Sequence, residues 1–332
     1  MIHTRLEHGE KGIESAVELL RAGELVAFPT ETVYGLGADA RSVEAVQKIY
    51  DAKGRPSGNP VIVHVADVNS ARNCVTVWPP LADQLAARFW PGPLTMILPR
   101  ANTLCAAVSA GRQTVAIRCP RHPVAEALLK AFDGPIAAPS ANRSGFTSPT
   151  TAAHVLAELN GRVPLIIDGG PCEVGLESTV LDLSTGKAPT ILRPGSITLE
   201  MLREVAPDVQ LHAVTVKTTE SAASPGLHDR HYAPRTMAYR FPRAEWPRVQ
   251  QRAEANGPVA LISFTDDVSL PAPHETLLLP DDPAAYARNL YAALREADEK
   301  KLNAIFVLLP EEHGGLWTAV TDRLRRATQV LT

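Results

Sequence analysis

The 332-residue sequence has no long hydrophobic run and no closely spaced cysteines. No apolar stretch approaches the roughly 20 residues that a membrane-spanning helix needs, and the opening MIHTRLEHGEKG is too polar for a signal peptide. The cysteines form no C-x-x-C pair, which argues against a zinc site and against a disulfide framework; they are Cys74, Cys105, Cys119 and Cys172. We therefore expect a cytoplasmic protein with reduced cysteines.

The chain also lacks an excess of positive charge. Its formal net charge is -3, so it does not have the overall cationic character of an autonomous nucleic-acid-binding protein. Hydrophobic residues make up 45% of the sequence and charged residues 21%, which is typical of a globular protein with a large core rather than of a disordered chain. The length predicts about two domains.

Helical patterns and short apolar runs alternate through the first 200 residues. Residues 13–20 are apolar at helical spacing, and residues 25–28 have the pattern of a buried strand. A second helix is predicted after Ser42, a good N-cap, and ends where Gly54 and Pro56 prevent its continuation. Further strands are expected at 61–65, 94–98, 114–117, 135–138, 165–167, 179–183 and 190–192. These elements indicate a mixed α/β domain with a twisted, largely open sheet over residues 1–207.

The composition changes after residue 207. Residues 208–236 are polar and rich in Ser, Thr, Ala and Pro, and we interpret them as a linker. Beyond them, strands are predicted at 259–264, 276–279 and 304–309. A helix capped by Asp282 and Pro283 and a terminal helix from about Trp317 complete the pattern. We therefore expect a small β/α domain over residues 237–332.

A glycine motif near the N-terminus does not predict dinucleotide binding. Gly35, Gly37 and Ala40 match G-x-G-x-x-A, but six residues separate the motif from the strand that ends at Phe28. No acidic residue follows about 20 positions later. Both features of a dinucleotide fingerprint are therefore missing.

Two polar turns carry side chains suited to an anionic ligand. KGRPSGNP at 53–60 places Lys53 and Arg55 on a loop before a predicted strand, and PSANRSG at 139–145 places Ser140 and Asn142 after another. In α/β sheets the loops at the carboxyl ends of strands converge on ligands, and Lys, Arg and backbone amides suit phosphate oxygens. On spacing alone, a solvated turn with Asx-type hydrogen bonds explains these residues equally well.

Six ordered motifs decide between these interpretations. They are PTETVYGL at 29–36, KGRPSGNPVIVHV at 53–65, WPGPLT at 90–95, VAIRCP at 115–120, APSANRSG at 138–145 and ESTV at 177–180. Together they resemble the YrdC-like family, and most closely its two-domain threonylcarbamoyl-AMP synthases. The resemblance covers residues 10–205 nearly continuously, includes SPGLHDRHYAP at 224–234, and extends more weakly through the C-terminal domain. It implies a twisted, open, mixed sheet with a concave basic face, followed by a small Rossmann-like β/α domain.

The resemblance implies that L-threonine, bicarbonate or CO2, and ATP react to give threonylcarbamoyl-AMP and pyrophosphate, the first step of tRNA threonylcarbamoyladenosine formation. A carbamate oxygen of the substrate can attack the α-phosphorus itself, so position and charge supply the catalysis. We expect Mg2+ to accompany ATP, with no metal cage built by the protein. The product is expected to pass to tRNA threonylcarbamoyl-transfer proteins, with weak or no direct nucleic acid binding and no membrane contact.

The resemblance also assigns the site residues. The implied catalytic residues are Lys53, Arg55, Ser140 and Asn142. The implied ATP-binding residues are Arg55, Asn59, Thr114, Ser140, Ser148, Arg193 and Tyr232. The implied threonine-binding residues are Thr32, His64, Arg118, Ala138 and Ser178. Arg118 could hold the threonine carboxylate in a bidentate pair, whereas His64 without the family match would be a core histidine.

The linker is implied to act as a lid. Its HYAP segment would fold back over the cleft so that Tyr232 reaches the nucleotide, and a plain flexible tether is the alternative. Two departures from the usual family sequence bear on this docking. Leu227 stands where Met is usual, and Phe146 and Thr147 replace a common Arg-Pro.

Two other functions compete with this interpretation. A double-stranded RNA-binding module would use the basic face and show a strongly salt-dependent affinity, against which the acidic overall balance argues. A carbamoyl-transfer enzyme with a YrdC-like domain would act on carbamoyl phosphate, but the sequence has none of the Cys-rich metal motifs of such fusions.

Overall fold

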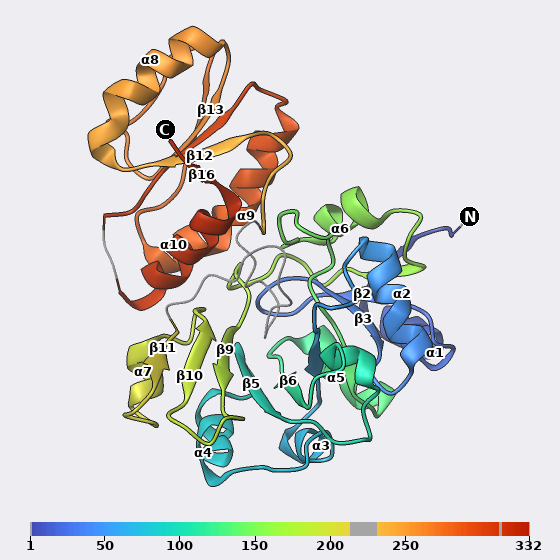
Figure 1. Ribbon diagram of the computed structural model, residues 1–332. Helices are drawn as coiled ribbons and strands as arrows, with labels where there is room; N and C mark the ends of the chain where they lie inside the picture. The colour runs from blue at the N-terminus through green and yellow to red at the C-terminus, as the bar shows by residue number, and fades with distance from the viewer. Residues whose placement is uncertain (1, 213–230, 312–313, 332) are drawn as a thin grey trace.

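The computed structural model describes residues 2–212, 231–311 and 314–331, and its strands form two sheets (Figure 1). The larger sheet is mixed, with the order β1-β8-β2-β3-β7-β4-β6-β5-β9-β10-β11. Its strands are β1 (Arg5–Glu7), β2 (Val26–Phe28), β3 (Gly35–Asp39), β4 (Ile62–His64), β5 (Leu94–Pro99), β6 (Thr114–Arg118), β7 (Ile136–Ala137), β8 (Leu165–Ile167), β9 (Thr179–Asp182), β10 (Thr190–Arg193) and β11 (Gln210–Leu211). The predicted twisted, mixed α/β fold is confirmed.

Helices lie between the strands of this sheet in the sequence. They are α1 (Gly9–Arg21), α2 (Val43–Lys53), α3 (Val68–Arg72), α4 (Pro80–Phe89), α5 (Pro123–Phe132), α6 (Ala152–Leu159) and α7 (Leu199–Arg203), with the 3-10 turn η1 (Ala106–Ser109). The predicted start of α2 is confirmed, because the Ser42 hydroxyl accepts a hydrogen bond of 3.1 Å from the Ala45 amide. Gly54 ends α2 with a φ of 60°, so Lys53 is the last residue of the helix and not, as predicted, part of the loop.

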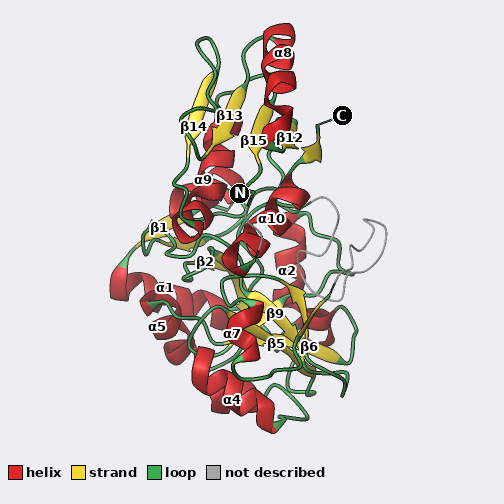
Figure 2. Cartoon of the chain, turned by 90° about the vertical axis from the view of Figure 1, so that its left-hand side faces the viewer, coloured by secondary structure: helices red, strands yellow, loops and turns green. Residues whose placement is uncertain are grey.

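The smaller sheet is entirely parallel, with the order β14-β13-β15-β12-β16. Its elements are β12 (Ala238–Phe241), η2 (Arg243–Glu245), α8 (Trp246–Asn256), β13 (Ala260–Ser263), β14 (Glu275–Leu278), α9 (Pro283–Glu299), β15 (Ile305–Leu308), α10 (Gly315–Ala327) and β16 (Gln329–Val330). Helix α8 covers one face, and α9 and α10 cover the face turned toward the larger sheet (Figures 1 and 2). Asp282 caps α9 as predicted, since its carboxylate accepts from the Ala285 amide at 2.8 Å.

The hydrophobic core under α9 and α10 is continuous with the larger unit. Buried side chains of these helices pack in one cluster with Val33, Leu176 and Tyr232. The domain limits at 207 and 236 stay a prediction. Among the described residues, no helix combines the length and the hydrophobicity that crossing a bilayer requires.

Strand β3 was not predicted, because its Gly35-Leu36-Gly37 sequence has the composition of a turn. The strand lies between β2 and β7, and its glycines are buried there. A Cβ on Gly37 would lie 2.8 Å from Phe28 Cε1 and 2.9 Å from Ile136 Cγ2. Close packing against both neighbouring strands therefore explains Gly37, and no dinucleotide motif is involved.

We predict that Gly37→Ala lowers the free energy of unfolding by about 1–3 kcal/mol, because the added methyl overpacks this contact. Urea unfolding measures the change. Gly35→Ala is the matched control, since the nearest atom to its added Cβ, Ala138 Cβ, is 3.3 Å away. Equal losses in the two variants would contradict the packing explanation.

Candidate active site

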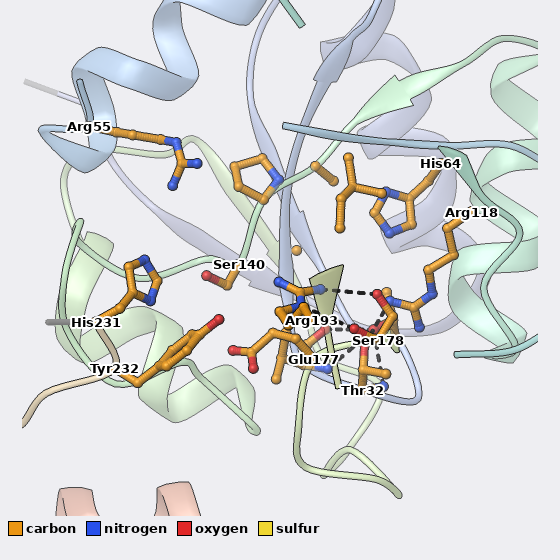
Figure 3. Close-up of a pocket in the computed structure, with 16 residues that line it drawn as sticks. Thr32, Arg55, His64, Arg118, Ser140, Glu177, Ser178, Arg193, His231 and Tyr232 are labelled. Carbon is orange, nitrogen blue, oxygen red and sulfur yellow. Dashed lines mark hydrogen bonds between the residues drawn. The ribbon is translucent and has the colours of Figure 1, made fainter. Parts of the chain in front are cut away.

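A pocket lies on the larger sheet, at the side that faces α9 and α10 (Figure 3). Residues from the 30–35 loop, the ends of β4 and β6, the turn after β7, the ends of β9 and β10, and the segment 231–232 line it. Motifs that are far apart in the sequence thus meet in one place.

The pocket brings together most of the residues predicted for the site. Those that line it are Thr32, Arg55, His64, Arg118, Ala138, Ser140, Ser178, Arg193 and Tyr232. Those that do not are Lys53, Asn59, Thr114, Asn142 and Ser148. The first group spans both the predicted threonine side and the predicted nucleotide side.

Arg118 lies at one end of the pocket, at the carboxyl end of β6. Its Nη1 donates to Thr32 Oγ1 at 2.8 Å, and its Nη2 lies 2.7 Å from Glu31 Oε2. The alignment at Glu31 is poor for a hydrogen bond, so this contact is an ion pair. Arg118 is 3% exposed and Glu31 0%, so the pair is fixed inside the protein with its charge compensated. A guanidinium held in this way is suited to bind a ligand carboxylate.

His64 is paired with Arg118 across the parallel strands β4 and β6. Burial and the neighbouring Arg118 lower the pKa of His64 to about 3, despite an opposing backbone hydrogen bond. The imidazole is therefore neutral at physiological pH. Its Nδ1 is buried and has no hydrogen-bond partner among the described residues, so it can serve a ligand in the pocket.

Ser178 and Arg193 hold the middle of the pocket, at the adjoining ends of β9 and β10. Arg193 Nε donates to the Ser178 carbonyl at 3.1 Å, and its Nη2 lies 3.2 Å from Ser178 Oγ. Thr95 Oγ1 lies 2.7 Å from the same hydroxyl. The chain can approach this closely because of Gly195, where a Cβ would lie 2.4 Å from the Thr179 amide nitrogen.

Arg55 occupies the other end of the pocket (Figure 3). Its Nη2 donates to the Pro60 carbonyl at 3.0 Å, and burial lowers its pKa. Lys53 lies behind it and donates to the carbonyls of Ser140, at 2.5 Å, and of Asn142. Burial and Arg55 lower the pKa of Lys53, while these carbonyls favour its charged form.

The solvated-turn explanation is wrong for Lys53 and Arg55, whereas the Asn142 amide does bond backbone carbonyls of its own turn, those of Arg143 and Phe146. Lys53 is 2% exposed, Arg55 9% and Asn142 1%, so none of them is a surface residue. Lys53 ties the end of α2 to the turn that carries Ser140. The Asn142 amide donates to the Phe146 carbonyl at 2.7 Å and stabilises the same turn. Lys53 and Asn142 thus shape the pocket wall from behind.

The remaining predicted residues lie farther from the pocket. Asn59 offers its backbone carbonyl to Tyr50 and Arg55. Thr114 begins β6, at the opposite end of that strand from Arg118. Ser148 donates to Glu177, which lines the pocket.

Glu177 was not predicted as a site residue from the sequence, although it begins the ESTV motif. It is 6% exposed, and its carboxylate accepts from Ser148 at 2.5 Å, Tyr291 at 2.9 Å and Arg323 at 2.8 Å. Burial alone would raise the pKa of Glu177, but Arg323 and Arg193 outweigh it and lower the pKa. The local signal was present in ESTV, whereas no local pattern points to Arg323, which is 146 residues away.

The end of the predicted lid reaches the pocket. Residues 213–230, including Leu227 and most of SPGLHDRHYAP, lie outside the described residues. Tyr232 is 1% exposed, and its hydroxyl points into the pocket and has no hydrogen-bond partner in the described part of the chain (Figure 3). Thr147 Oγ1 donates to the Tyr232 carbonyl at 3.1 Å, and the Ala233 amide donates to Gly145 at 3.0 Å. The departure at Thr147 therefore supplies a docking contact.

Comparisons with known proteins assign the chain to a family. A family model described as "Telomere recombination" (Sua5_yciO_yrdC) matches residues 18–195, and one described as "Threonylcarbamoyl-AMP synthase, C-terminal domain" matches residues 197–329. The threonylcarbamoyl-AMP synthase of Pyrococcus abyssi is 40% identical, with 99% of this chain and 97% of the relative aligned. The chain belongs to the threonylcarbamoyl-AMP synthase family.

A second relative and a solved structure support the same family assignment. The threonylcarbamoyl-AMP synthase of Bacillus subtilis is 41% identical over 97% of this chain and 94% of its own. A crystal structure of Pyrococcus abyssi Sua5 complexed with L-threonine is 39% identical, covers 100% of both chains and superposes with a TM-score of 0.89. The predicted family, fold class and enzyme class are confirmed, and the roles of the individual site residues stay predictions.

We predict that His64 makes stability depend on pH. Because its folded pKa of about 3 lies below the ordinary 6.5, the unfolded chain binds a proton that the folded synthase does not. The free energy of unfolding should therefore fall as the pH drops from 6.5 toward 3, by up to about 1.4 kcal/mol per unit. His64→Gln should remove this contribution in urea titrations at pH 7 to 4.

The exposed His3, changed to Gln, is the control and should keep the wild-type slope. Parallel pH profiles for the wild type and His64→Gln would show that His64 protonates freely in the folded state.

Proposed function

We propose that this pocket binds threonine carbamate beside ATP and joins them to form threonylcarbamoyl-AMP, with release of pyrophosphate. One observation carries the proposal: a single pocket is lined, from one end to the other, by Arg118, Arg193 and Arg55 (Figure 3). A carboxylate and a triphosphate are the two anionic ends of the reacting pair. The order of the cations along the pocket suits a substrate pair laid out in the same order.

We assign threonine to the Arg118 end. The fork of Arg118 pairs with the amino acid carboxylate, while Thr32 and Ser178 offer hydroxyls to its polar groups. Ala138 and neutral His64 form the wall against the side chain. Selection of threonine over serine rests on one methyl group, which is worth only about 1–3 kcal/mol.

We assign the triphosphate to Arg55, Ser140 and Arg193, and the Tyr232 hydroxyl to the nucleotide. Lys53 acts indirectly by fixing the Ser140 turn. No group of three or more His, Cys, Asp or Glu in the described residues is arranged to hold a metal. We therefore expect Mg2+ to arrive bound to the phosphate oxygens of ATP, as part of the substrate.

In the proposed step an oxygen of the carbamate attacks the α-phosphorus of ATP. A new bond joins that oxygen to phosphorus, the bond from the α-phosphorus to the bridging oxygen breaks, and pyrophosphate leaves with that electron pair. Guanidinium groups already in place stabilise the charge that develops on the phosphate oxygens. Exclusion of water protects the carbamate, which is formed from threonine and bicarbonate or CO2.

The product is a mixed anhydride of a carbamic acid and AMP. Such a compound is an activated acyl donor, so its consumer is an enzyme that transfers the threonylcarbamoyl group to an amine. We place that transfer on a tRNA adenosine, by separate proteins in the cytoplasm. The buried position of the pocket cations suits a small-molecule site better than an RNA-binding face, since RNA phosphates bind exposed Lys and Arg.

Pyrophosphate release tests the proposed function. The full chain is incubated with ATP, Mg2+ and bicarbonate, with and without L-threonine, and the adenylate is detected by mass. We expect release that requires threonine and a product with the mass of threonylcarbamoyl-AMP. Release that ignores threonine, or no adenylate, would overturn the proposal.

We predict that Arg118→Lys and Arg55→Lys separate the two substrates. Each keeps its charge but loses the planar fork, at a cost of roughly 10- to 100-fold in the KM of the substrate it binds. Arg118→Lys should raise the KM for threonine, and Arg55→Lys the KM for ATP. Steady-state kinetics with one substrate saturating gives both values, and an inverted or identical pattern would refute the assignment of the two ends.

A further inference from the structure

A guanidinium from the C-terminal helix α10 reaches the wall of the catalytic pocket. Arg323 is 0% exposed, and its Nε donates to Glu177 Oε2 at 2.8 Å. Its Nη2 donates to the backbone carbonyls of Pro194, at 3.0 Å, and of Glu177, at 3.3 Å. One side chain of the smaller sheet's domain thus contacts two separate segments of the larger one.

These two segments carry residues of both proposed subsites. Glu177 directly precedes Ser178, and Pro194 directly follows Arg193. Strands β9 and β10 are antiparallel neighbours, and both residues lie just outside their ladder at the same open end. By holding a carbonyl of each segment, Arg323 closes this end of the ladder and fixes the separation of Ser178 and Arg193.

The contacts that surround Arg323 prevent it from turning away. Its Nη1 donates to Asp322 Oδ2 at 2.7 Å, and Arg326 binds the other oxygen of Asp322 at 2.9 Å. The carbon of its guanidinium lies 5.4 Å from the centre of the Tyr232 ring. Arg323 therefore also contacts the segment that brings Tyr232 to the pocket.

The Glu177 carboxylate is held by the protein at both of its oxygens. Three donors already occupy its two oxygens: Ser148, Tyr291 and Arg323. Its negative charge compensates Arg323 and the nearby Arg193, which lets two buried cations lie close together. Glu177 thus links Arg323 to the pocket wall.

We propose that Arg323 is a positioning residue that sets the places of Ser178 and Arg193, so that the C-terminal domain completes the middle of the active site, where the proposed threonine and ATP subsites adjoin. The proposal rests on the function proposed above. It assigns the C-terminal domain a direct part in binding both threonine and ATP. It also explains why a cation is buried between two domains where an apolar side chain would fill the space.

Arg323→Lys tests this proposal, because lysine keeps the charge but has one nitrogen in place of three. We expect the KM values for threonine and for ATP to rise together and kcat/KM to fall by roughly 10- to 100-fold, as for a substrate displaced by about 1 Å. The neighbouring Arg325, whose side chain is 57% exposed, is the matched control. Arg325→Ala should keep wild-type constants.

A second variant distinguishes a loss of positioning from a loss of folding. Arg323→Met with Glu177→Gln removes both charges of the ion pair, so neither partner stays buried without the other, and Asp322 keeps its contact with Arg326. We expect this double variant to unfold cooperatively in urea and still to show the joint rise of both KM values.

Three results would overturn the positioning role. The first is wild-type constants in Arg323→Lys, and the second is wild-type constants in the folded double variant. The third is a loss of activity that only follows the fraction of unfolded protein. An active wild type with unaffected variants refutes this inference alone, whereas a wild type without threonine-dependent release refutes the proposed function and this inference together.

Discussion

Four buried cations in and directly behind one pocket determine much of how this structure is built. Arg55, Arg118, Arg193 and Lys53 are each at most 9% exposed, and water cannot compensate charges at that depth. The fold supplies carbonyls at the ends of strands and helices, and carboxylates such as Glu31, in place of water. Because those partners are fixed, the guanidinium groups are already oriented when an anionic substrate arrives.

The need to compensate buried charge also explains why the two sheets are packed together through α9 and α10. The ion pair between Arg323 and Glu177 is buried, and a buried pair is costly unless its geometry is good and all its hydrogen bonds are satisfied. Helix α10 can supply such a partner only if it packs directly against the larger sheet. The shared core with Val33, Leu176 and Tyr232 provides that packing. Stability and function therefore depend on the same interface.

Local patterns in the sequence were enough for the caps and most strands, whereas the site residues were predicted only from the resemblance to a known family. Ser42 and Asp282 act through neighbours three residues away, so their pattern is local. Strand β3 was not predicted because its glycines are required by close packing against β2 and β7, and composition does not reveal such packing. Arg323 and the role of Lys53 depend on contacts 146 and 87 residues apart, for which local sequence has no signal.

A crystal structure of this chain with L-threonine and a non-hydrolysable ATP analogue would show whether the buried cations bind the two substrates as proposed. We expect the threonine carboxylate on Arg118 and the triphosphate on Arg55 and Arg193, with the α-phosphorus facing the amino group of threonine. Threonine bound outside this pocket, or a nucleotide whose phosphates lie at the Arg118 end, would rule out this assignment.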